Sequence, residues 1–330
     1  MHLKTPRLAS RRTLLTALLG ILLLPLAPQA QQAAENSGSH VGPPLPATHA
    51  TIAQQAAAAT PAAEQEPLTI LLSNDDGYGA RGLVALIKAL TGWAHVYVAA
   101  PATDQSGKGH SITTRDPIYL NRMENPDTVA AFAIEAPPAT CVRLGLNELM
   151  KAQRPDVVIS GINRGENLGL STFLSGTVGA AREAAFSGIP AIAVSLDTDP
   201  ARPRAETDAD YDHLAAYVKT LVGELRAQGK LKPGLFLNIN APAGEPKGVL
   251  ITRQTVIPSK QLFDGRENPR RRIYYWSDYE PVHDDAEGTD TWAIKRGFIA
   301  ITPMTLDQTN RGGMDALRGF EKKAAAAAKP

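Results

Sequence analysis

Short apolar runs alternate with longer segments of helical periodicity from residue 68 to residue 242. Each run is continuously apolar, which is typical of strands buried on both faces of a sheet. Such strands, separated by helices, build a mostly parallel sheet with a helical layer on each side. The pattern predicts an α/β protein with a three-layer, doubly wound, Rossmann-like fold. The expected strands are 68–74, 95–101, 155–163, 189–196 and 235–242, and the expected helices are 82–90, 140–153, 177–188 and 211–228.

The first 30 residues have the pattern of an export signal. Four basic residues within the first 12 positions precede the uncharged, mostly apolar stretch 13–27. This stretch is shorter than the roughly 20 residues that span a bilayer, and its length suits the apolar core of a signal peptide. The segment SRRTLL at 10–15 resembles a twin-arginine signal, although an ordinary export signal or a retained anchor also fits. We therefore expect a periplasmic protein with no stable membrane span after processing.

Composition divides the rest of the chain. Residues 31–66 are rich in Ala, Gln, Pro, Ser and Thr and contain no aromatic residue, which predicts a disordered linker. A folded domain is expected over 67–319, followed by a tail over 320–330. Without residues 1–30 the chain carries 30 basic and 33 acidic side chains, so no binding of a nucleic acid polymer is expected. The single cysteine, Cys141, excludes an intrachain disulfide and falls in an expected buried helix.

Polar residues follow three of the expected strands. They occupy the segments 73–76, 104–107 and 160–165. Ligands of doubly wound sheets bind beyond the carboxyl ends of the strands. We therefore expect the three segments to converge on one functional site.

The first of these segments can be interpreted in more than one way. Gly77, Gly79 and Gly82 have the spacing of a dinucleotide-binding turn. However, Asp75 and Asp76 would place two carboxylates beside the phosphates, and each charge at about 4 Å would oppose binding by several kcal/mol at an effective dielectric near 20. A cation between the carboxylates would reverse the sign, which favours a metal site. A plain turn is the third interpretation, because Asn, Asp and Gly all favour turns.

Neutral oxygens from the other two segments would complete a metal site. Ser106 and Asn163 provide them. An oxygen-only set with few protein charges suits Mg²⁺, Mn²⁺ or Ca²⁺, and no Cys/His cluster supports zinc. Ser175, Gly176 and Thr177 precede an Ala-rich expected helix, where N–H groups can receive a phosphate, although a plain helix N-cap is an equally ordinary role.

Four motifs in order carry a family resemblance. They are ILLSNDDG at 70–77, DQSGKGHSIT at 104–113, PDVVISGINRGENLG at 155–169 and SGTVGAAREAAFSGIPAIAVS at 175–195. Together they resemble the SurE family of 5′/3′-nucleotidases, and weaker matches continue through LFLNINAP, YYW, EGTD and ITPM. The chain differs at 136–139, where it reads APPA and the family usually reads Gly-Thr-Pro-Ala, so the substrate preference stays open.

The resemblance implies a divalent-metal-dependent phosphomonoesterase, with Mg²⁺ or Mn²⁺ as its metal. Its substrates would be nucleoside 5′- and 3′-monophosphates. Some members of the family also act on short polyphosphate, which would then be a further substrate. A water that the ion activates would attack the phosphorus. The implied metal ligands are Asp75, Asp76, Ser106 and Asn163, and the implied phosphate contacts are Asn167, Ser175, Gly176 and Thr177.

The proton donor for the leaving group is not evident. His110 follows Ser106 closely and is a candidate general acid or phosphate contact, and an exposed loop histidine without a role is an equal alternative. Lys108 and Arg164 are candidates for neutralising substrate charge, or are solvated side chains.

Residues 252–290 are polar and combine Arg266 and Arg270–Arg272 with the aromatic segment Tyr274–Trp276. Two interpretations stay open: an excursion that contacts substrate or another subunit, with aromatics that stack on a base, or a solvated hairpin whose aromatic stripe faces the core. The family resemblance implies a C-terminal hairpin exchanged between subunits, so a homodimer or homotetramer is expected.

Two other classes of function compete with the phosphomonoesterase. A periplasmic nucleotide- or polyphosphate-binding protein would bind without turnover, and it would not need a water-bearing metal. A nicotinamide oxidoreductase would bind its reduced cofactor without metal, but the second strand ends at Pro101 without the acidic residue that binds ribose.

Overall fold

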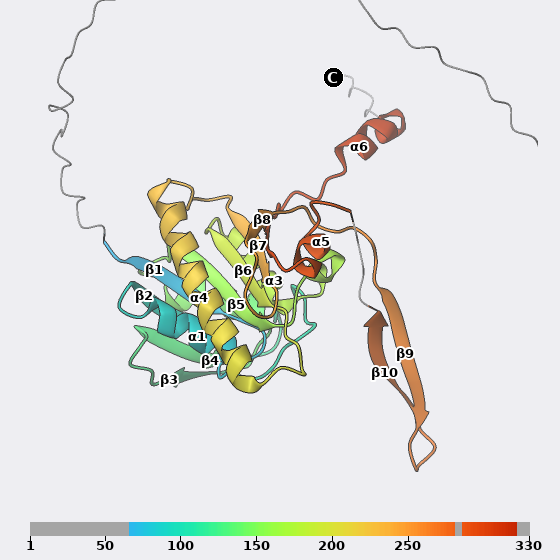
Figure 1. Ribbon diagram of the computed structural model, residues 1–330, viewed down its shortest axis with the longest axis horizontal. Coiled ribbons are helices and arrows are strands. Elements are labelled where there is room, and N and C mark those ends of the chain that lie inside the picture. Colours follow the sequence, from blue (N-terminus) through green and yellow to red (C-terminus); the bar gives the residue numbers. More distant parts are fainter. Residues whose placement is uncertain (1–65, 281–285, 322–330) are drawn as a thin grey trace, which may run out of the picture. The chain divides into compact units, whose positions relative to one another are not determined.

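The computed structural model describes residues 66–280 and 286–321 (Figure 1). The predicted signal peptide, all of the predicted linker except Glu66, and most of the predicted tail lie outside these residues. The described part contains the expected doubly wound α/β sheet. The strands are β1 (Leu68–Ser73), β2 (Ala94–Pro101), β3 (Leu120–Met123), β4 (Ala130–Ile134), β5 (Val157–Arg164), β6 (Ala191–Leu196), β7 (Phe236–Ala241), β8 (Val249–Ile251), β9 (Lys260–Glu267), β10 (Ile273–Glu280) and β11 (Ile299–Pro303).

Strand order places a topological switch point in the middle of the large sheet. The nine strands run β3-β4-β2-β1-β5-β6-β7-β11-β8. All neighbours from β4 to β7 are parallel, and antiparallel pairing occurs only where β3 meets β4 and β11 meets β7. The chain advances from β1 toward one edge of the sheet and from β5 toward the other. The carboxyl ends of β1 and β5 therefore flank the position where doubly wound sheets bind ligands.

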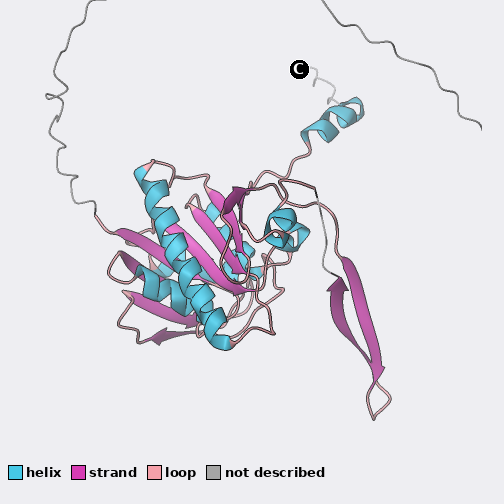
Figure 2. Ribbon diagram, in the orientation of Figure 1, coloured by secondary structure: helices cyan, strands magenta, loops and turns pink. Residues whose placement is uncertain are grey.

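Helices cover both faces of this sheet, which confirms the three-layer prediction (Figure 2). On β1, Ile70 and Leu72 join the core beneath α1 and α4, whereas Leu71 joins the core beneath α2 and α3. This alternation explains why the run at 68–73 is continuously apolar, since both of its faces are buried. The helices are α1 (Arg81–Leu90), α2 (Pro138–Leu144), η1 (Gly145–Leu149), η2 (Gly169–Phe173), α3 (Gly176–Phe186), α4 (Arg204–Ala227), α5 (Asp290–Lys295), α6 (Arg311–Leu317) and η3 (Arg318–Phe320).

The helix expected over 211–228 begins earlier, at Arg204 (α4), and another predicted helix is interrupted. The segment 140–153 was expected to be continuous, but α2 ends at Leu144 and is followed by the π-helical segment η1. Gly145 lies where the two meet and packs tightly: a Cβ there would stand 3.1 Å from Leu71 Cδ2 and 3.2 Å from the Ala99 Cβ. The change of helix type therefore occurs where the backbone lies close against side chains of the sheet. Cys141 is buried in α2, as expected.

Strands β9 and β10 form a separate two-stranded antiparallel sheet, which is the expected C-terminal hairpin excursion. Its large apolar side chains are exposed, including Phe263, Ile273, Tyr275 and Trp276. The interpretation in which the aromatic segment faces the core of its own chain is therefore wrong. Among the residues that the structure describes, no helix is both long and apolar enough to span a bilayer.

Candidate functional site

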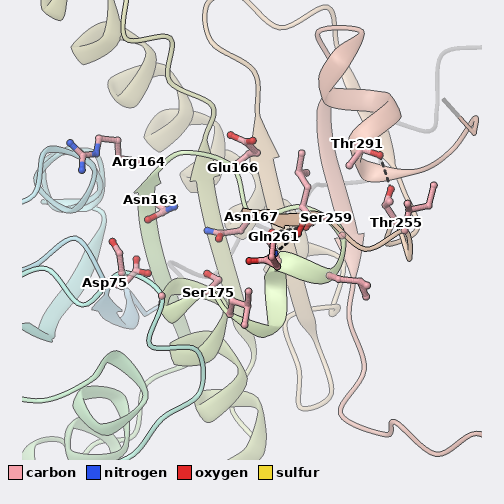
Figure 3. A pocket seen from close by; sticks show the side chains of 18 residues that line it. Asp75, Asn163, Arg164, Glu166, Asn167, Ser175, Thr255, Ser259, Gln261 and Thr291 are labelled. Atoms are coloured by element: carbon pink, nitrogen blue, oxygen red, sulfur yellow. Dashed lines mark hydrogen bonds between the residues drawn. The ribbon is translucent and has the colours of Figure 1, made fainter. Parts of the chain in front are cut away.

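A cavity of about 380 Å³ opens at the switch point, and it is lined by the loops that follow β1, β2 and β5 (Figure 3). Segments near α5 and at the start of β9 complete its wall. The three polar segments therefore converge as expected. Five of the eight residues predicted to bind metal or phosphate line the cavity: Asp75, Ser106, Asn163, Asn167 and Ser175.

Asp75 lies two residues beyond the end of β1 and is only 3% exposed. The Thr177 hydroxyl donates a hydrogen bond to its Oδ1, and the Gln105 N–H donates to its main-chain oxygen at 2.7 Å. Burial raises the pKa of this carboxyl, although the bond from Thr177 opposes the rise. Gly176 lies directly against it, because a Cβ on Gly176 would stand 2.8 Å from the Asp75 Cβ. Gly176 and Thr177 therefore hold Asp75 from behind and do not line the cavity.

Asp76 is half-buried and lies beside the cavity rather than on its wall. Its Oδ2 accepts a hydrogen bond from the Arg164 N–H at 3.0 Å, which ties the β1 loop to the β5 loop. Burial, together with the neighbouring charge of Asp75, raises the pKa of Asp76 to about 6. The break from extended backbone needed here comes at Gly77, whose φ is 101°.

Asn163 is aimed by an irregularity in the sheet. The register between β5 and β6 shifts between Ser160 and Asn163, and Gly161 passes so close to β6 that a Cβ would stand 2.3 Å from the Val194 oxygen. The Asn163 Nδ2 donates to the Gly165 oxygen at 2.8 Å. Its Oδ1 accepts no hydrogen bond from any residue in 66–280 or 286–321, so this oxygen is available at the cavity wall.

The donor set fits a hard divalent cation. Two carboxylates whose pKa values are raised by burial lie beside the free amide oxygen of Asn163 and the hydroxyl of Ser106. Ser106 is placed by a tight loop, in which its N–H donates to Asp104 Oδ1 at 2.7 Å. In the described part of the chain no group of three or more His, Cys, Asp or Glu side chains could hold a metal. A set of two carboxylates and neutral oxygens is instead the kind that Mg²⁺ and Mn²⁺ accept.

Three buried polar side chains that sequence reasoning missed hold Asn167. Its N–H donates to Asn240 Oδ1 at 2.7 Å, and its oxygen accepts from Asn238 Nδ2 at 2.8 Å and from Asn240 Nδ2 at 3.2 Å. Its own Nδ2 donates to Ser195 Oγ at 2.9 Å. All three partners are fully buried on β6 and β7. The one signal in the sequence was the pair of asparagines inside the apolar run 235–242, since a strand core tolerates such groups only when they are hydrogen-bonded.

A fully buried carboxylate on α5 fixes the opposite wall of the cavity. Asp290 accepts hydrogen bonds from the N–H groups of Gly169 at 2.8 Å, Thr255 at 2.9 Å and Thr291 at 2.9 Å. Thr255 and Thr291 line the cavity, and their hydroxyls are 2.7 Å apart (Figure 3). The sequence marked this residue only as part of the weak EGTD match.

Ser175 is both a helix cap and part of the cavity wall. Its Oγ accepts the Val178 N–H at 3.1 Å, so it is the N-cap of α3, and it also lines the cavity. The N-terminus of an 11-residue helix thus faces the same space as Asp75. The dipole of this helix favours an anion near its N-terminus.

Of the remaining predicted residues, some line the cavity and others do not. Arg164 lines the cavity, but neither Lys108 nor His110 does. The His110 Nε2 lies 2.8 Å from Glu183 Oε2, and the same carboxylate accepts two hydrogen bonds from Arg143. His110 is thus engaged with the ion pair between Arg143 on α2 and the buried Glu183 on α3.

The glycine spacing of the opening loop has a packing cause. A Cβ on Gly82 would stand 1.9 Å from the Ile162 oxygen, so Gly82 allows α1 to lie directly on β5. Gly77 allows the turn itself, and a Cβ on Gly79 would meet nothing within 4 Å. The match to a dinucleotide-binding turn is therefore accounted for without a nucleotide.

Comparisons with known proteins agree with the motifs. The sequence profile of the family described as Survival protein SurE matches residues 70–260. The chain is 40% identical over 255 residues to 5′-nucleotidase SurE 1 of Thermus thermophilus, covering 77% of this chain and 98% of that protein. It is 41% identical over 262 residues to 5′-nucleotidase SurE of Geotalea uraniireducens, covering 77% and 99%.

A solved structure matches as well. The crystal structure of the SurE protein from Aquifex aeolicus superposes with a TM-score of 0.64 at 34% identity, covering 77% of this chain and 100% of that chain. The matched residues include the lining residues of the cavity from Asp75 to Ser175. This chain belongs to the SurE family.

Proposed function

We propose that this protein is a divalent-metal-dependent nucleotidase that hydrolyses nucleoside monophosphates to nucleoside and phosphate. The observation that carries the proposal is the meeting of two features in one cavity. The carboxylate of Asp75 lies at the carboxyl end of β1, and the N-terminus of α3 faces it through Ser175. One feature suits a cation and the other suits an anion, which is the pairing that a metal-bound phosphate requires. Relatives at about 40% identity are named 5′-nucleotidase SurE.

The residues of the chain would bind and orient the phosphate group. We assign phosphate contacts to the N-terminus of α3, to Ser175 and to the side-chain amide of Asn167. The Asn167 Nδ2 carries two hydrogens, and Ser195 accepts one of them, so the second is free to donate to a phosphate oxygen. Gly176 and Thr177 contribute by fixing Asp75 against the same helix start.

The metal assignment is Mg²⁺ or Mn²⁺, held by Asp75, Asp76, Asn163 and Ser106. When bound, such an ion neutralises phosphoryl charge and lowers the pKa of a water nucleophile. The carboxylates orient the ion, and the Arg164 N–H that donates to Asp76 keeps the two loops in register. Phosphate release after complete chelation of metal ions would remove this assignment.

The experiment that tests the function measures phosphate release from a panel of 3′- and 5′-nucleoside monophosphates. The expected result is release that stops with EDTA and returns with Mg²⁺ or Mn²⁺, which also ranks the 3′ and 5′ substrates and the bases. Short polyphosphate belongs in the same panel, because the family resemblance raised it as a further substrate. A folded protein that binds nucleotide but releases no phosphate with any metal would instead be a binding protein.

The proposal also covers the location of the protein and its oligomeric state. We propose export to the periplasm, supported by the basic and apolar pattern within residues 1–30, and cell fractionation of the full-length chain tests it. We also propose a homodimer or homotetramer built through the β9–β10 hairpin. Its exposed Phe263, Tyr275 and Trp276 support this, because a two-stranded sheet with such side chains gains stability from a partner surface. Light scattering that finds only monomer would contradict it.

A further inference from the structure

The loop that carries Ser106 is fixed to the rest of the fold on both sides of this residue. Before it, the Gln105 N–H donates to the Asp75 main-chain oxygen at 2.7 Å. After it, the Gly109 N–H donates to the Leu174 oxygen at 2.9 Å. The residues between these two contacts are exposed, so their own burial does not fix them. The position of the Ser106 hydroxyl at the cavity wall therefore depends on what holds the loop at its two ends.

Two glycines make the path of this loop depend on its contacts. Gly107 and Gly109 have φ values of 73° and 56°, in the left-handed region. Glycine adopts this region and the right-handed one at similar cost, so the two positions do not by themselves select one path for the backbone. The contacts that the loop makes after Gly107 select it instead.

Helix α3 lies directly against the second end of the loop. A Cβ on Gly179 would stand 2.2 Å from the Gly109 oxygen and 3.2 Å from the His110 Cα. This is the helix whose N-cap, Ser175, lines the cavity. The loop that carries a proposed metal ligand and the helix that faces the proposed phosphate therefore meet at Gly109 and His110.

The His110 side chain attaches this end of the loop to α3. Its Nε2 lies 2.8 Å from Glu183 Oε2, and its ring packs against that of Phe186 with the centroids 4.9 Å apart. Burial raises the pKa of Glu183, but the hydrogen bonds from His110 and Arg143 outweigh burial and lower this pKa overall. An ionised carboxylate only accepts hydrogen bonds, so the His110 Nε2 carries a hydrogen and donates it. Hydrogen bonds to an ionised group are stronger than neutral ones, so this contact holds the loop firmly.

We propose that His110 is a positioning residue for the reaction. By donating to Glu183 it holds the loop against α3, and it thereby places the Ser106 hydroxyl for the divalent cation. His110 does not line the cavity, so its effect on the site is exerted through the loop. This inference rests on the proposed function, in which Ser106 is a metal ligand.

The first test measures the dissociation constant of Mn²⁺, from the EPR signal of the free ion, for wild type, His110→Ala and His110→Gln. We expect the constant to rise about tenfold in His110→Ala, as is typical when the support of a metal ligand is removed. His110→Gln should recover most of the affinity, because its amide N–H can still donate to Glu183. The control is His95→Ala, which changes an exposed residue at the start of β2, away from the carboxyl ends of the strands. It should change the constant less than about twofold.

The second test asks whether His110 acts through Ser106. His110→Ala is combined with Ser106→Ala, and the cost of losing His110 is compared in the two backgrounds. We expect the tenfold loss to shrink to less than about twofold when Ser106 is already alanine, because no hydroxyl is left to position. A general loosening of the site would give the same loss in both backgrounds. Thermal melts in EDTA establish that each variant is folded at the temperature of the titrations.

Three outcomes overturn the inference: an unchanged Mn²⁺ affinity in His110→Ala, an equal loss in His110→Ala and His110→Gln, or an undiminished loss in the Ser106→Ala background. A wild-type chain that does not bind Mn²⁺ overturns it as well, together with the metal assignment. The proposed function fails separately, if wild type binds Mn²⁺ but releases no phosphate from AMP. The titrations need no turnover, so in that case they still support or overturn the role of His110.

Discussion

Two buried aspartates in this molecule have opposite surroundings. Asp290, at the start of α5, is fully buried and accepts hydrogen bonds from three main-chain N–H groups. Asp75, just beyond the end of β1, is nearly as buried, but the other residue that donates hydrogen bonds to its side chain is Thr177, and it lies next to Asp76. Burial raises the pKa of Asp75 and the nearby charge of Asp104 adds to the rise.

The difference separates a carboxylate whose charge the fold itself compensates from one that suits the proposed metal. The three N–H donors compensate the loss of water around the Asp290 carboxylate, so its negative charge needs no ligand. The fold does not offset the desolvation of the Asp75 and Asp76 pair, and a divalent cation is the ligand that would. The same residue type therefore fixes the cavity wall in one region and, under the proposed function, holds a metal in the other.

The largest expected effect comes from Asp76→Asn. We expect the metal-dependent rate of phosphate release to fall about 1,000-fold or more, because half of the charge that holds the ion is lost. The metal-free fold should be as stable as wild type or more stable, since a charged, half-buried Asp76 opposes folding at neutral pH. Initial rates with saturating Mn²⁺ and thermal melts in EDTA measure the two quantities. Wild-type turnover in the variant would remove Asp76 from the metal site.

Asp290→Asn should give the reverse result. We expect a loss of about 3 kcal/mol in the free energy of unfolding, because an amide N–H₂ would oppose one of the three N–H donors in a buried position. Urea denaturation measures it, and the exposed Asp315→Asn on α6 is the control, expected to leave the unfolding midpoint nearly unchanged. Equal stability of Asp290→Asn and wild type would mean that the three N–H donors do not stabilise the charge of Asp290, and the contrast with Asp75 would be wrong.

A third substitution, Asn240→Ala, tests the proposed phosphate contact at Asn167. Asn240→Ala removes two of the hydrogen bonds that hold the backbone of Asn167. We expect kcat/KM for a nucleoside monophosphate to fall about tenfold. Without these hydrogen bonds Asn167 shifts slightly, and its proposed contact with the phosphate is weakened.

The exposed Asn147, which donates to the Arg143 oxygen, supplies the control Asn147→Ala. Asn240→Asp keeps the acceptor for the Asn167 N–H and should recover part of the loss. A purely structural role for Asn240 would instead lower the melting temperature in both Asn240 variants and leave kcat/KM of the folded fraction unchanged.

The sequence predicted the fold and the convergence of the polar loops for a simple reason. Continuous apolar runs such as that of β1 identify a sheet buried on both faces, and the carboxyl ends of parallel strands meet at one edge. Cys141 followed the same logic: it is buried, and burial raises the pKa of its thiol to about 12. Local pattern is enough where one periodicity sets both the strand and its environment.

Long-range contacts could not be predicted in this way. Asn240 contacts Asn167 across 73 residues, and Asp290 contacts Gly169 across 121. A lone Asn in a strand or Asp at a helix start has many ordinary uses, and nothing local says which backbone groups it will meet. The contact of His110 with Glu183, 73 residues away, is of the same kind, and no local pattern indicated it.

The smallest expected effect is a pH dependence that reports the unbalanced pair. The pKa of Asp76 is about 6 in the fold against an ordinary 3.8, so the folded chain binds this proton more tightly than the unfolded chain. The resulting stabilisation is complete below the ordinary pKa and is lost as pH rises through about 6, which removes about 1 kcal/mol between pH 5 and pH 7 without metal. Mn²⁺ competes with the proton, so the stabilisation by Mn²⁺ should instead grow over that interval. Urea unfolding of wild type and Asp76→Asn, with EDTA or with Mn²⁺, measures both slopes, and the difference between the two proteins isolates this carboxyl. A metal-free difference that does not change with pH would mean that Asp76 is solvated like an ordinary surface carboxylate, and the contrast with Asp290 would then rest on Asp75 alone.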